Sequence, residues 1–326
     1  MNERRRHILL AGALAVITPS AALSQKKFAR VGILGVTSLA AGAPYSSAFK
    51  QRLHDLGWIE ARNIEYVMLA AEGSVERLDS LARELVERKV DVLLAGPPNV
   101  AVALHRATRT IPIVMANVPD PVALGLVASL ARPGGNVTGI SSQTNVLVAK
   151  QIELLKEILP TAKRIALLYS PQNPSAAMFR EVAGQAAAFL RVSLEFVPVH
   201  RPEELEAVLQ RVARDGAQAV VVPADPVMLS QRLRLNAELA RVRLPAAFAN
   251  RDHALDGALL SYAPDLVGNF RLAAGYADRI LKGANPGDLP VGQSESINLV
   301  VNLKTAKALG ITIPQGVLLR ANEVIE

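Results

Sequence analysis

The stretches IVMANVPDPVALGLV (113–127) and AVVVPADPVMLSQRL (219–233) decide the fold, because each is an apolar run that breaks at an Asp-Pro pair before a helix-like pattern. Aspartate is a favoured helix N-cap, and proline is favoured at the first helical position, where its missing N–H costs nothing. One interpretation is that Asp120 and Asp225 only begin helices. The other is that these caps also lie in the wall of a binding cleft, where a carboxylate can meet a ligand's ammonium group.

The same alternation of strand and helix runs through most of the chain. Short apolar runs predict strands at 28–36, 63–69, 90–96, 111–118 and 136–140, and again at 163–170, 192–199, 217–224, 244–250 and 257–262. Helical patterns fill the gaps, among them 45–56, 121–131 and 226–241. Such alternation predicts parallel sheets wound by right-handed crossovers. Two series of this kind predict an α/β fold of two doubly wound lobes.

The final part of the chain predicts how the lobes are joined. The helix expected at 265–283 follows the second series in sequence but can pack back on the first lobe. We therefore assign 25–142 plus 262–288 to lobe one and 143–261 plus 289–326 to lobe two, with crossings near 141–145, 255–264 and 286–296. A chain that crosses more than once makes a hinge between the lobes.

The first residues are typical of an export signal. Arginines at 4–6 precede a short apolar stretch, and Ala22-Leu23-Ser24 fits a cleavage site that would leave Gln25 as the new N-terminus. We expect residues 1–24 to be a signal peptide and the mature protein to be periplasmic, with export by either the Sec or the twin-arginine route. The chain has no cysteine, which excludes a thiol-linked lipid anchor at this point.

The formal charge of +7 is dispersed among acidic neighbours, so neither a basic face nor a nucleic-acid-reading motif is indicated. The histidines are scattered without metal-ligand spacing, and no G-x-S-x-G elbow is present. We therefore expect no enzyme activity, no cofactor, no metal and no nucleic-acid partner. His253, near a strand end, is the one histidine worth checking as a site residue.

Ligands of open parallel sheets bind at the carboxyl ends of the strands, and two facing lobes would direct these ends into one cleft. The loops concerned are 36–38, 96–99, 117–120, 170–175, 224–225 and 250–252. Tyr45 is expected to begin a helix that faces this cleft. Asn99 heads a helix whose free amides could attract a carboxylate, although an ordinary cap explains it equally well.

Four long segments, AEGSVERLDSLARELVERKVDVLLAG (71–96), IPIVMANVPDPVALGLVASLARPGGNVTGIS (111–141), LLYSPQNPSA (167–176) and INLVVNLKTAKALGITIP (297–314), resemble one family. It is a family of bacterial ABC-transporter substrate-binding proteins that includes tryptophan- and tyrosine-binding members. The resemblance covers about 30–326 and implies a periplasmic binding protein of type I fold. One departure is GPPNVA (96–101), where relatives often have a loop such as Gly-Thr-Pro-Ala.

The resemblance implies ligand contacts from the first, third and fourth strand-end loops of each lobe. In this chain the candidates from those loops are Thr37, Ser38, Asn99, Asp120, Asn173, Ser175, Asp225 and Asn250, to which the cleft-facing Tyr45 is added. The implied function is capture of an amino acid or related small polar metabolite and its delivery to the permease of an ABC importer. A sensor that signals to a membrane partner is the alternative. A monomer that does not insert into the membrane is expected.

Overall fold

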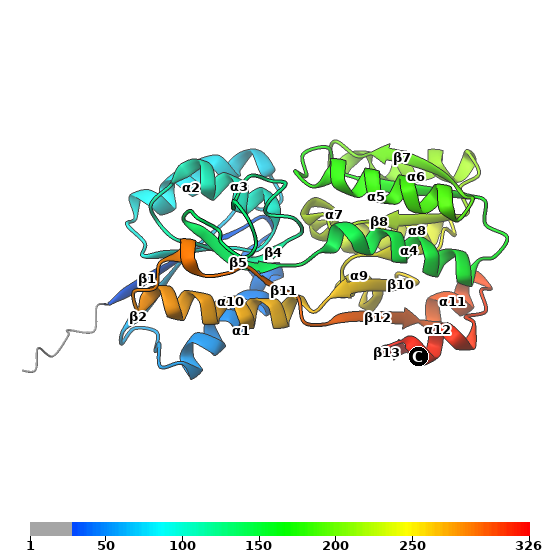
Figure 1. The fold of residues 1–326 in the computed structure, drawn as a ribbon. Coiled ribbons are helices and arrows are strands. Elements are labelled where there is room, and N and C mark those ends of the chain that lie inside the picture. Colours follow the sequence, from blue (N-terminus) through cyan, green and yellow to red (C-terminus); the bar gives the residue numbers. More distant parts are fainter. Residues whose placement is uncertain (1–27) are drawn as a thin grey trace, which may run out of the picture.

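The computed structural model describes residues 28–326, and the predicted signal peptide (1–24) lies outside this part of the chain. Residues 28–326 form two lobes that lie side by side, each around its own sheet (Figure 1). The six-stranded sheet of lobe one has the order β11-β5-β4-β3-β1-β2, and the seven-stranded sheet of lobe two has the order β13-β12-β10-β9-β8-β6-β7. This confirms the predicted α/β fold of two lobes. No helix of the described part has the length and apolar character needed to cross a membrane.

Lobe one is a parallel sheet with helices on both faces. Its strands are β1 (Ala29–Gly35), β2 (Ile64–Ala70), β3 (Val92–Ala95), β4 (Ile113–Val118), β5 (Val137–Ser141) and β11 (Gly292–Gln293). Its helices are α1 (Leu39–Asp55) and α10 (Leu266–Leu281) on one face, and α2 (Leu78–Glu87) and α3 (Pro98–Ala107) on the other, with the 3-10 helices η1 (Val75–Arg77) and η3 (Pro286–Asp288) in loops.

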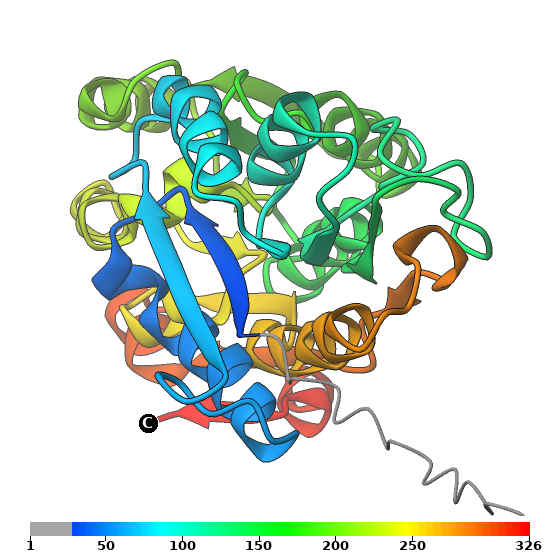
Figure 2. The same cartoon turned by 90° about the vertical axis from the view of Figure 1, so that its left-hand side faces the viewer.

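Alternate residues of each strand point to opposite faces of a sheet, so each central strand serves two cores. In β3, Val92 and Leu94 join the core under α1 and α10. Leu93 and Ala95 of the same strand join the core under α2 and α3. In Figure 2 the blue and cyan strands β1 and β2 lie between these two helix layers.

Lobe two repeats the design. Its strands are β6 (Arg164–Tyr169), β7 (Ser193–Pro198), β8 (Ala219–Val222), β9 (Ala246–Phe248), β10 (Leu260–Pro264), β12 (Ile297–Asn302) and β13 (Glu323–Ile325). Its helices are α4 (Thr144–Ile158), α5 (Ala176–Phe189), η2 (Pro202–Glu204), α6 (Leu205–Arg214), α7 (Pro226–Ser230), α8 (Arg232–Arg241), α9 (Arg251–Leu255), α11 (Leu303–Leu309) and α12 (Gln315–Arg320). One core lies under α4 and α5, and the other under α6 and α8.

The sheet of lobe two departs from the all-parallel expectation at one place. Strand β12 pairs with β10 in the antiparallel direction, with Tyr262 opposite Leu299. The reason is that the chain returns to lobe two after visiting lobe one, so β12 enters the sheet from the opposite end. The remaining strand pairs of this sheet are parallel.

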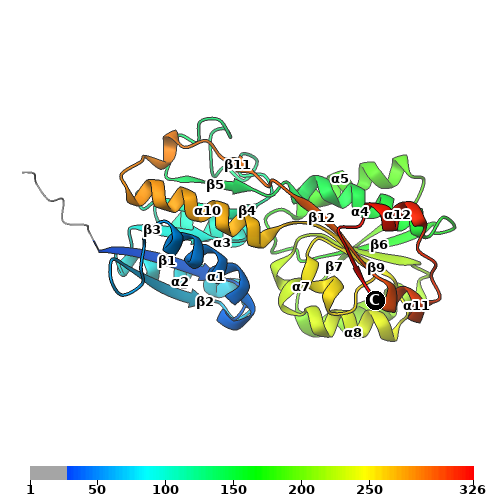
Figure 3. The same cartoon turned by 90° about the horizontal axis from the view of Figure 1, so that it is seen from below.

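Within residues 28–326 the chain crosses between the lobes after β5, after β10 and after β11. Helix α10 runs alongside α1 in lobe one (Figure 3). Strand pairing places β10 in the sheet of lobe two, although sequence analysis assigned 262–264 to lobe one. It places β11 in the sheet of lobe one, although 289–293 were assigned to lobe two.

Three predicted helices differ from the structure. The helix expected at 226–241 is divided into α7 and α8 at Gln231. Helix α1 begins at Leu39 rather than at Tyr45, because the Ser38 hydroxyl accepts a hydrogen bond from the amide of Ala41 (3.2 Å) and the helix continues through Pro44. The helix expected at 121–131 does not form. Asp120 does cap a turn there, but Gly125 adopts a left-handed conformation (φ 66°) that ends it.

The close approach of β4 and β5 requires a glycine. Gly139 has φ +129°, and a Cβ atom added to it would lie 2.2 Å from the carbonyl oxygen of Met115. The pairing of β4 with β5 shifts register between Met115 and Val118. This irregularity, which is typical of bulged strands beside binding sites, includes Asn117.

Candidate functional site

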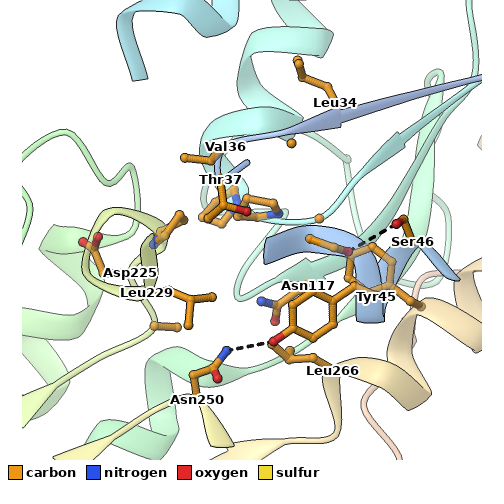
Figure 4. Close-up of a pocket in the computed structure, with 18 of the residues that line it drawn as sticks. Leu34, Val36, Thr37, Tyr45, Ser46, Asn117, Asp225, Leu229, Asn250 and Leu266 are labelled. Carbon is orange, nitrogen blue, oxygen red and sulfur yellow. Dashed lines mark hydrogen bonds between the residues drawn. The ribbon is translucent and has the colours of Figure 1, made fainter. Parts of the chain in front are cut away.

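A cavity lies between the lobes, at the carboxyl ends of β1, β3 and β4 from lobe one and of β8 and β9 from lobe two. This is where the fold brings strand-end loops together. The cavity volume is about 130 Å³. Figure 4 shows side chains of both lobes converging on it, with Thr37, Tyr45 and Asn117 from lobe one and Asp225, Leu229 and Asn250 from lobe two.

Most of the cavity wall is apolar. Leu34, Met68 and Phe270 contribute from lobe one, and Leu229 and Phe248 from lobe two. Phe270 comes from α10, and its ring lies 5.5 Å from the ring of Tyr45 at an angle of 32°. A wall of this kind favours a ligand with a flat or branched apolar body.

Tyr45 connects the two lobes. Its hydroxyl donates a hydrogen bond to Oδ2 of Asp252 (2.8 Å) and accepts one from Nδ2 of Asn250 (3.5 Å). Burial, followed by the negative charge of Asp252, raises the pKa of Tyr45 well above its usual range. The hydroxyl therefore remains a neutral donor at physiological pH, and it joins α1 of lobe one to the start of α9 in lobe two.

Asp225 lies in the cavity wall, but its carboxylate oxygens already accept hydrogen bonds from other groups of the protein. Its Oδ1 accepts from the amides of Val227 (2.9 Å) and Met228 (3.2 Å), which caps α7. Its Oδ2 accepts from the amide of Ser170 (3.1 Å) and from Nδ2 of Asn173 (3.3 Å). Burial raises the pKa of this carboxyl despite these four bonds.

His253 also lines the cavity and is buried, with 2% of its surface exposed. Its ring stacks on Phe248 (centroids 3.9 Å apart, 12° between the planes), and its Nδ1 lies 3.4 Å from Oδ1 of Asn236. Burial, with a smaller contribution from the charge of Arg232, lowers the pKa of His253 to about 3. The imidazole is therefore neutral and adds no charge to the cavity.

The predicted site residues divide into two groups. The cavity brings together Thr37, Ser38, Tyr45, Asp225 and Asn250. Asn99, Asp120, Asn173 and Ser175 do not line it, because their side chains are used or buried elsewhere. Oδ1 of Asn99 accepts from the amide of Val100, Asp120 caps its turn, and Asn173 bonds to Asp225. The hydroxyl of Ser175 is buried without a partner.

Sequence reasoning missed two prominent members of the wall. Asn117 ends β4, and its Oδ1 is buried without a hydrogen-bond partner (Figure 4). It belongs to the strand-end loop 117–120, where the Asp-Pro pair drew attention instead. Phe270 lies in α10, more than a hundred residues from the contributors at the ends of β1, β3 and β4, and no local pattern marks it.

Among the described residues there is no group of three metal-ligating side chains that could hold a metal ion. Among the described residues that line the cavity, Asp225 is the only carboxylic acid and His253 is the only histidine, and the His253 ring bonds to Asn236 instead of a hydroxyl. Its hydroxyls, amides and apolar side chains can bind and orient a small molecule.

Known proteins are similar to this chain in both sequence and structure. A tyrosine-binding protein of Clostridioides difficile (strain R20291) is 26% identical over 284 residues, covering 87% of this chain and 81% of that protein. An ABC domain from Streptococcus pneumonia in complex with L-Trp is 26% identical, with a TM-score of 0.82 over 91% of this chain and 99% of that one. The ligand-free, open structure of a Clostridium difficile substrate binding protein with adhesive properties is 25% identical over the same shares, with a TM-score of 0.65.

These two structures are almost equally distant from this chain in sequence, and the TM-score is higher for the L-Trp complex than for the ligand-free, open structure. In this chain the Tyr45 hydroxyl bonds to Asp252 across the lobes, so the arrangement described here is a closed one. The chain is a protein that captures a ligand, not an enzyme. With residues 31–325 matching the family model and with two lobes closing on a cavity of the type I periplasmic-binding-protein kind, the chain belongs to the ABC transporter substrate binding protein family.

Proposed function

We propose that this protein is the receptor of an ABC importer, which captures an amino acid or a related small metabolite and delivers it to the permease. The observation that carries the proposal is the cavity built by strand ends of both lobes and spanned by the Tyr45–Asp252 bond. The tyrosine-binding protein and the L-Trp complex among its relatives support a ligand of amino-acid size with an apolar body.

Capture would proceed by hinge closure, in which both lobes contribute walls and the ligand becomes buried between them. Three chain crossings form the hinge, at 142–143, 265 and 294–296. In the open form the apolar side chains of the two lobes would face water. Closing on a ligand with an apolar body removes that surface from water and lets the Tyr45 hydroxyl reach Asp252.

The proposal places the mature protein, from Gln25 onward, free in the periplasm as a monomer after removal of residues 1–24. A receptor that is not anchored would collect solute throughout the compartment and reach the permease subunits by diffusion. N-terminal sequencing of the protein secreted to the periplasm tests the cleavage after Ser24, and an intact N-terminus would contradict it.

A thermal-shift screen of residues 25–326 against amino acids, small carboxylates and nucleobases tests the capture step. A ligand at one hundred times its Kd adds about 2.7 kcal/mol of stability, which raises the Tm of a chain of this size by a few degrees. Delivery is tested by uptake of the labelled ligand into cells with and without this protein. Uptake that does not depend on the protein would contradict the importer role and favour a sensor.

A further inference from the structure

The cavity has no free counter-charge for an ammonium group. Of its lining residues that the structure describes, Asp225 is the only carboxylic acid, and lysine and arginine do not occur among them. A carboxylate has about four lone-pair positions, and Asp225 already accepts four hydrogen bonds, three from backbone amides and one from the side-chain amide of Asn173. A ligand ammonium could pair with Asp225 only by displacing the cap of α7 or the bonds to Ser170 and Asn173.

Two other carboxylates near the strand ends do not replace it. Asp120 does not line the cavity, and its Oδ1 accepts from the amide of Ala123 (3.0 Å). Asp252 does not line the cavity either, and its Oδ2 accepts from the Tyr45 hydroxyl (2.8 Å). The neutral hydroxyl of Tyr45 therefore lines the cavity, and the charged carboxylate of Asp252 lies behind it.

The polar groups that remain in the wall are neutral. Besides Asp225, the polar side chains of the wall are five hydroxyls, two amides and one neutral imidazole: Thr37, Ser38, Tyr45, Ser46, Thr144, Asn117, Asn250 and His253. Among them, Oδ1 of Asn117 is buried without a partner. The first turn of α1 borders the cavity at Ser38 and Leu39, and the N-terminal end of a helix repels a cation. A buried ammonium would exchange its hydration for neutral amide and hydroxyl oxygens without a free opposite charge, which does not compensate for the loss.

We propose that the solute has an apolar body and no ammonium group, so that it is a carboxylic acid or a neutral amide rather than an α-amino acid. This rests on the function proposed above and narrows its substrate class. A neutral N–H or O–H of such a solute would satisfy Oδ1 of Asn117, and the hydroxyls of Thr37 and Ser38 would donate to its carboxyl or amide oxygen.

Isothermal titration calorimetry of residues 25–326 with matched compounds tests the proposal. One set is L-tyrosine, 3-(4-hydroxyphenyl)propionate, the amide of that acid, and tyramine. The equivalent sets for tryptophan and leucine vary the body while the charge pattern stays the same. In the set that fits the cavity, we expect the des-amino acid or its amide to bind at least about ten-fold more tightly than the amino acid, and the amine to bind most weakly.

A variant tests the physical cause. Asn117→Asp places a carboxylate of nearly the same shape in the wall, so it should shift the preference toward the ammonium-bearing members of each set by at least about ten-fold. Asn285→Asp introduces the same charge in the exposed 285–288 turn, where Asn285 caps η3, and should leave the preference unchanged.

The outcomes are separable. Tighter binding of an amino acid than of its des-amino analogue by the wild type would overturn this inference and leave the proposed receptor function in place. A preference in Asn117→Asp that does not move toward the ammonium compounds would also overturn it. Absence of binding by every compound, to wild type and variant alike, would overturn the proposed receptor for amino acids and related compounds, and the inference with it.

Discussion

Removing the hydroxyl of Tyr45 should weaken ligand binding by opening the lobes. Tyr45→Phe deletes the hydrogen bond to Asp252 and keeps the ring that packs on Phe270. Hydrogen bonds to charged groups contribute about 1.5–3 kcal/mol, and the partial exposure of both partners reduces this to about 1–2 kcal/mol. Because the bond joins the lobes, this energy is lost from the closed form alone.

A loss of this size lowers the ratio of closed to open protein by about 5- to 30-fold, and the ligand's Kd should rise by the same factor. Calorimetry measures the Kd, since the single tryptophan, Trp58, lies outside the cavity and is a poor optical reporter. Small-angle X-ray scattering at a ligand concentration near the wild-type Kd should show a larger radius of gyration in the variant, because less of the variant is closed.

A double-mutant cycle separates the bond across the lobes from direct contact with the ligand. Asp252 does not line the cavity, so Asp252→Ala should weaken binding as much as Tyr45→Phe, and the double variant should be no weaker than either. Tyr276→Phe removes a similar bond, from the Tyr276 hydroxyl to the carbonyl of Pro290 (2.9 Å), inside lobe one and should leave Kd unchanged. Additive effects of Tyr45→Phe and Asp252→Ala would refute the reasoning.

Three further predictions concern stability. His253 has a folded pKa of about 3 against about 6.5 when unfolded, so the unfolded chain binds the extra proton between these values. The contribution of neutral His253 to the free energy of unfolding should therefore be fully present above pH 6.5 and fall as the pH drops toward 3. Urea unfolding at several pH values should show a shallower loss of stability in His253→Gln. Gly139→Ala should lower the free energy of unfolding by at least about 3 kcal/mol, because its Cβ would overlap the carbonyl of Met115, whereas Gly135→Ala, with open space around it, should change little. Asp225→Ala should lower the free energy of unfolding by about 2–4 kcal/mol, because it removes the cap of α7 and leaves buried donors without an acceptor. A Tm equal to that of the wild type would contradict the four hydrogen bonds described for Asp225.

The strands and the place of the site follow from sequence more closely than the helices do. The apolar runs at 111–118 and 217–224 contain β4 (Ile113–Val118) and β8 (Ala219–Val222), because strands buried on both faces are continuously apolar. The position of the cavity then follows, because ligands of open parallel sheets bind at the carboxyl ends of the strands. Helix α1 begins six residues earlier than predicted, because the Ser38 hydroxyl caps its N-terminus and the helix continues through Pro44.

The residues that close the site could not be predicted, because they meet only in three dimensions. Tyr45 and Asp252 are 207 residues apart, and neither segment contains a pattern that names the other. The free oxygen of Asn117 is visible only when every neighbouring donor has been placed. Asp225 shows the reverse case, since its type and position suggest a ligand contact while its four bonds engage it within the protein.

The return of the chain to lobe one fixes when that lobe can fold. Its core is completed by α10 and its sheet by β11, which are synthesised after most of lobe two. The bond from Nε1 of Trp58 to Oδ1 of Asp278 (2.8 Å) closes a separation of 220 residues. Contacts this far apart in sequence make folding slow, so the N-terminal half must wait without its partner helix while the rest emerges. Lobe one therefore stays incomplete until β11 (Gly292–Gln293) has been made, close to the end of the chain.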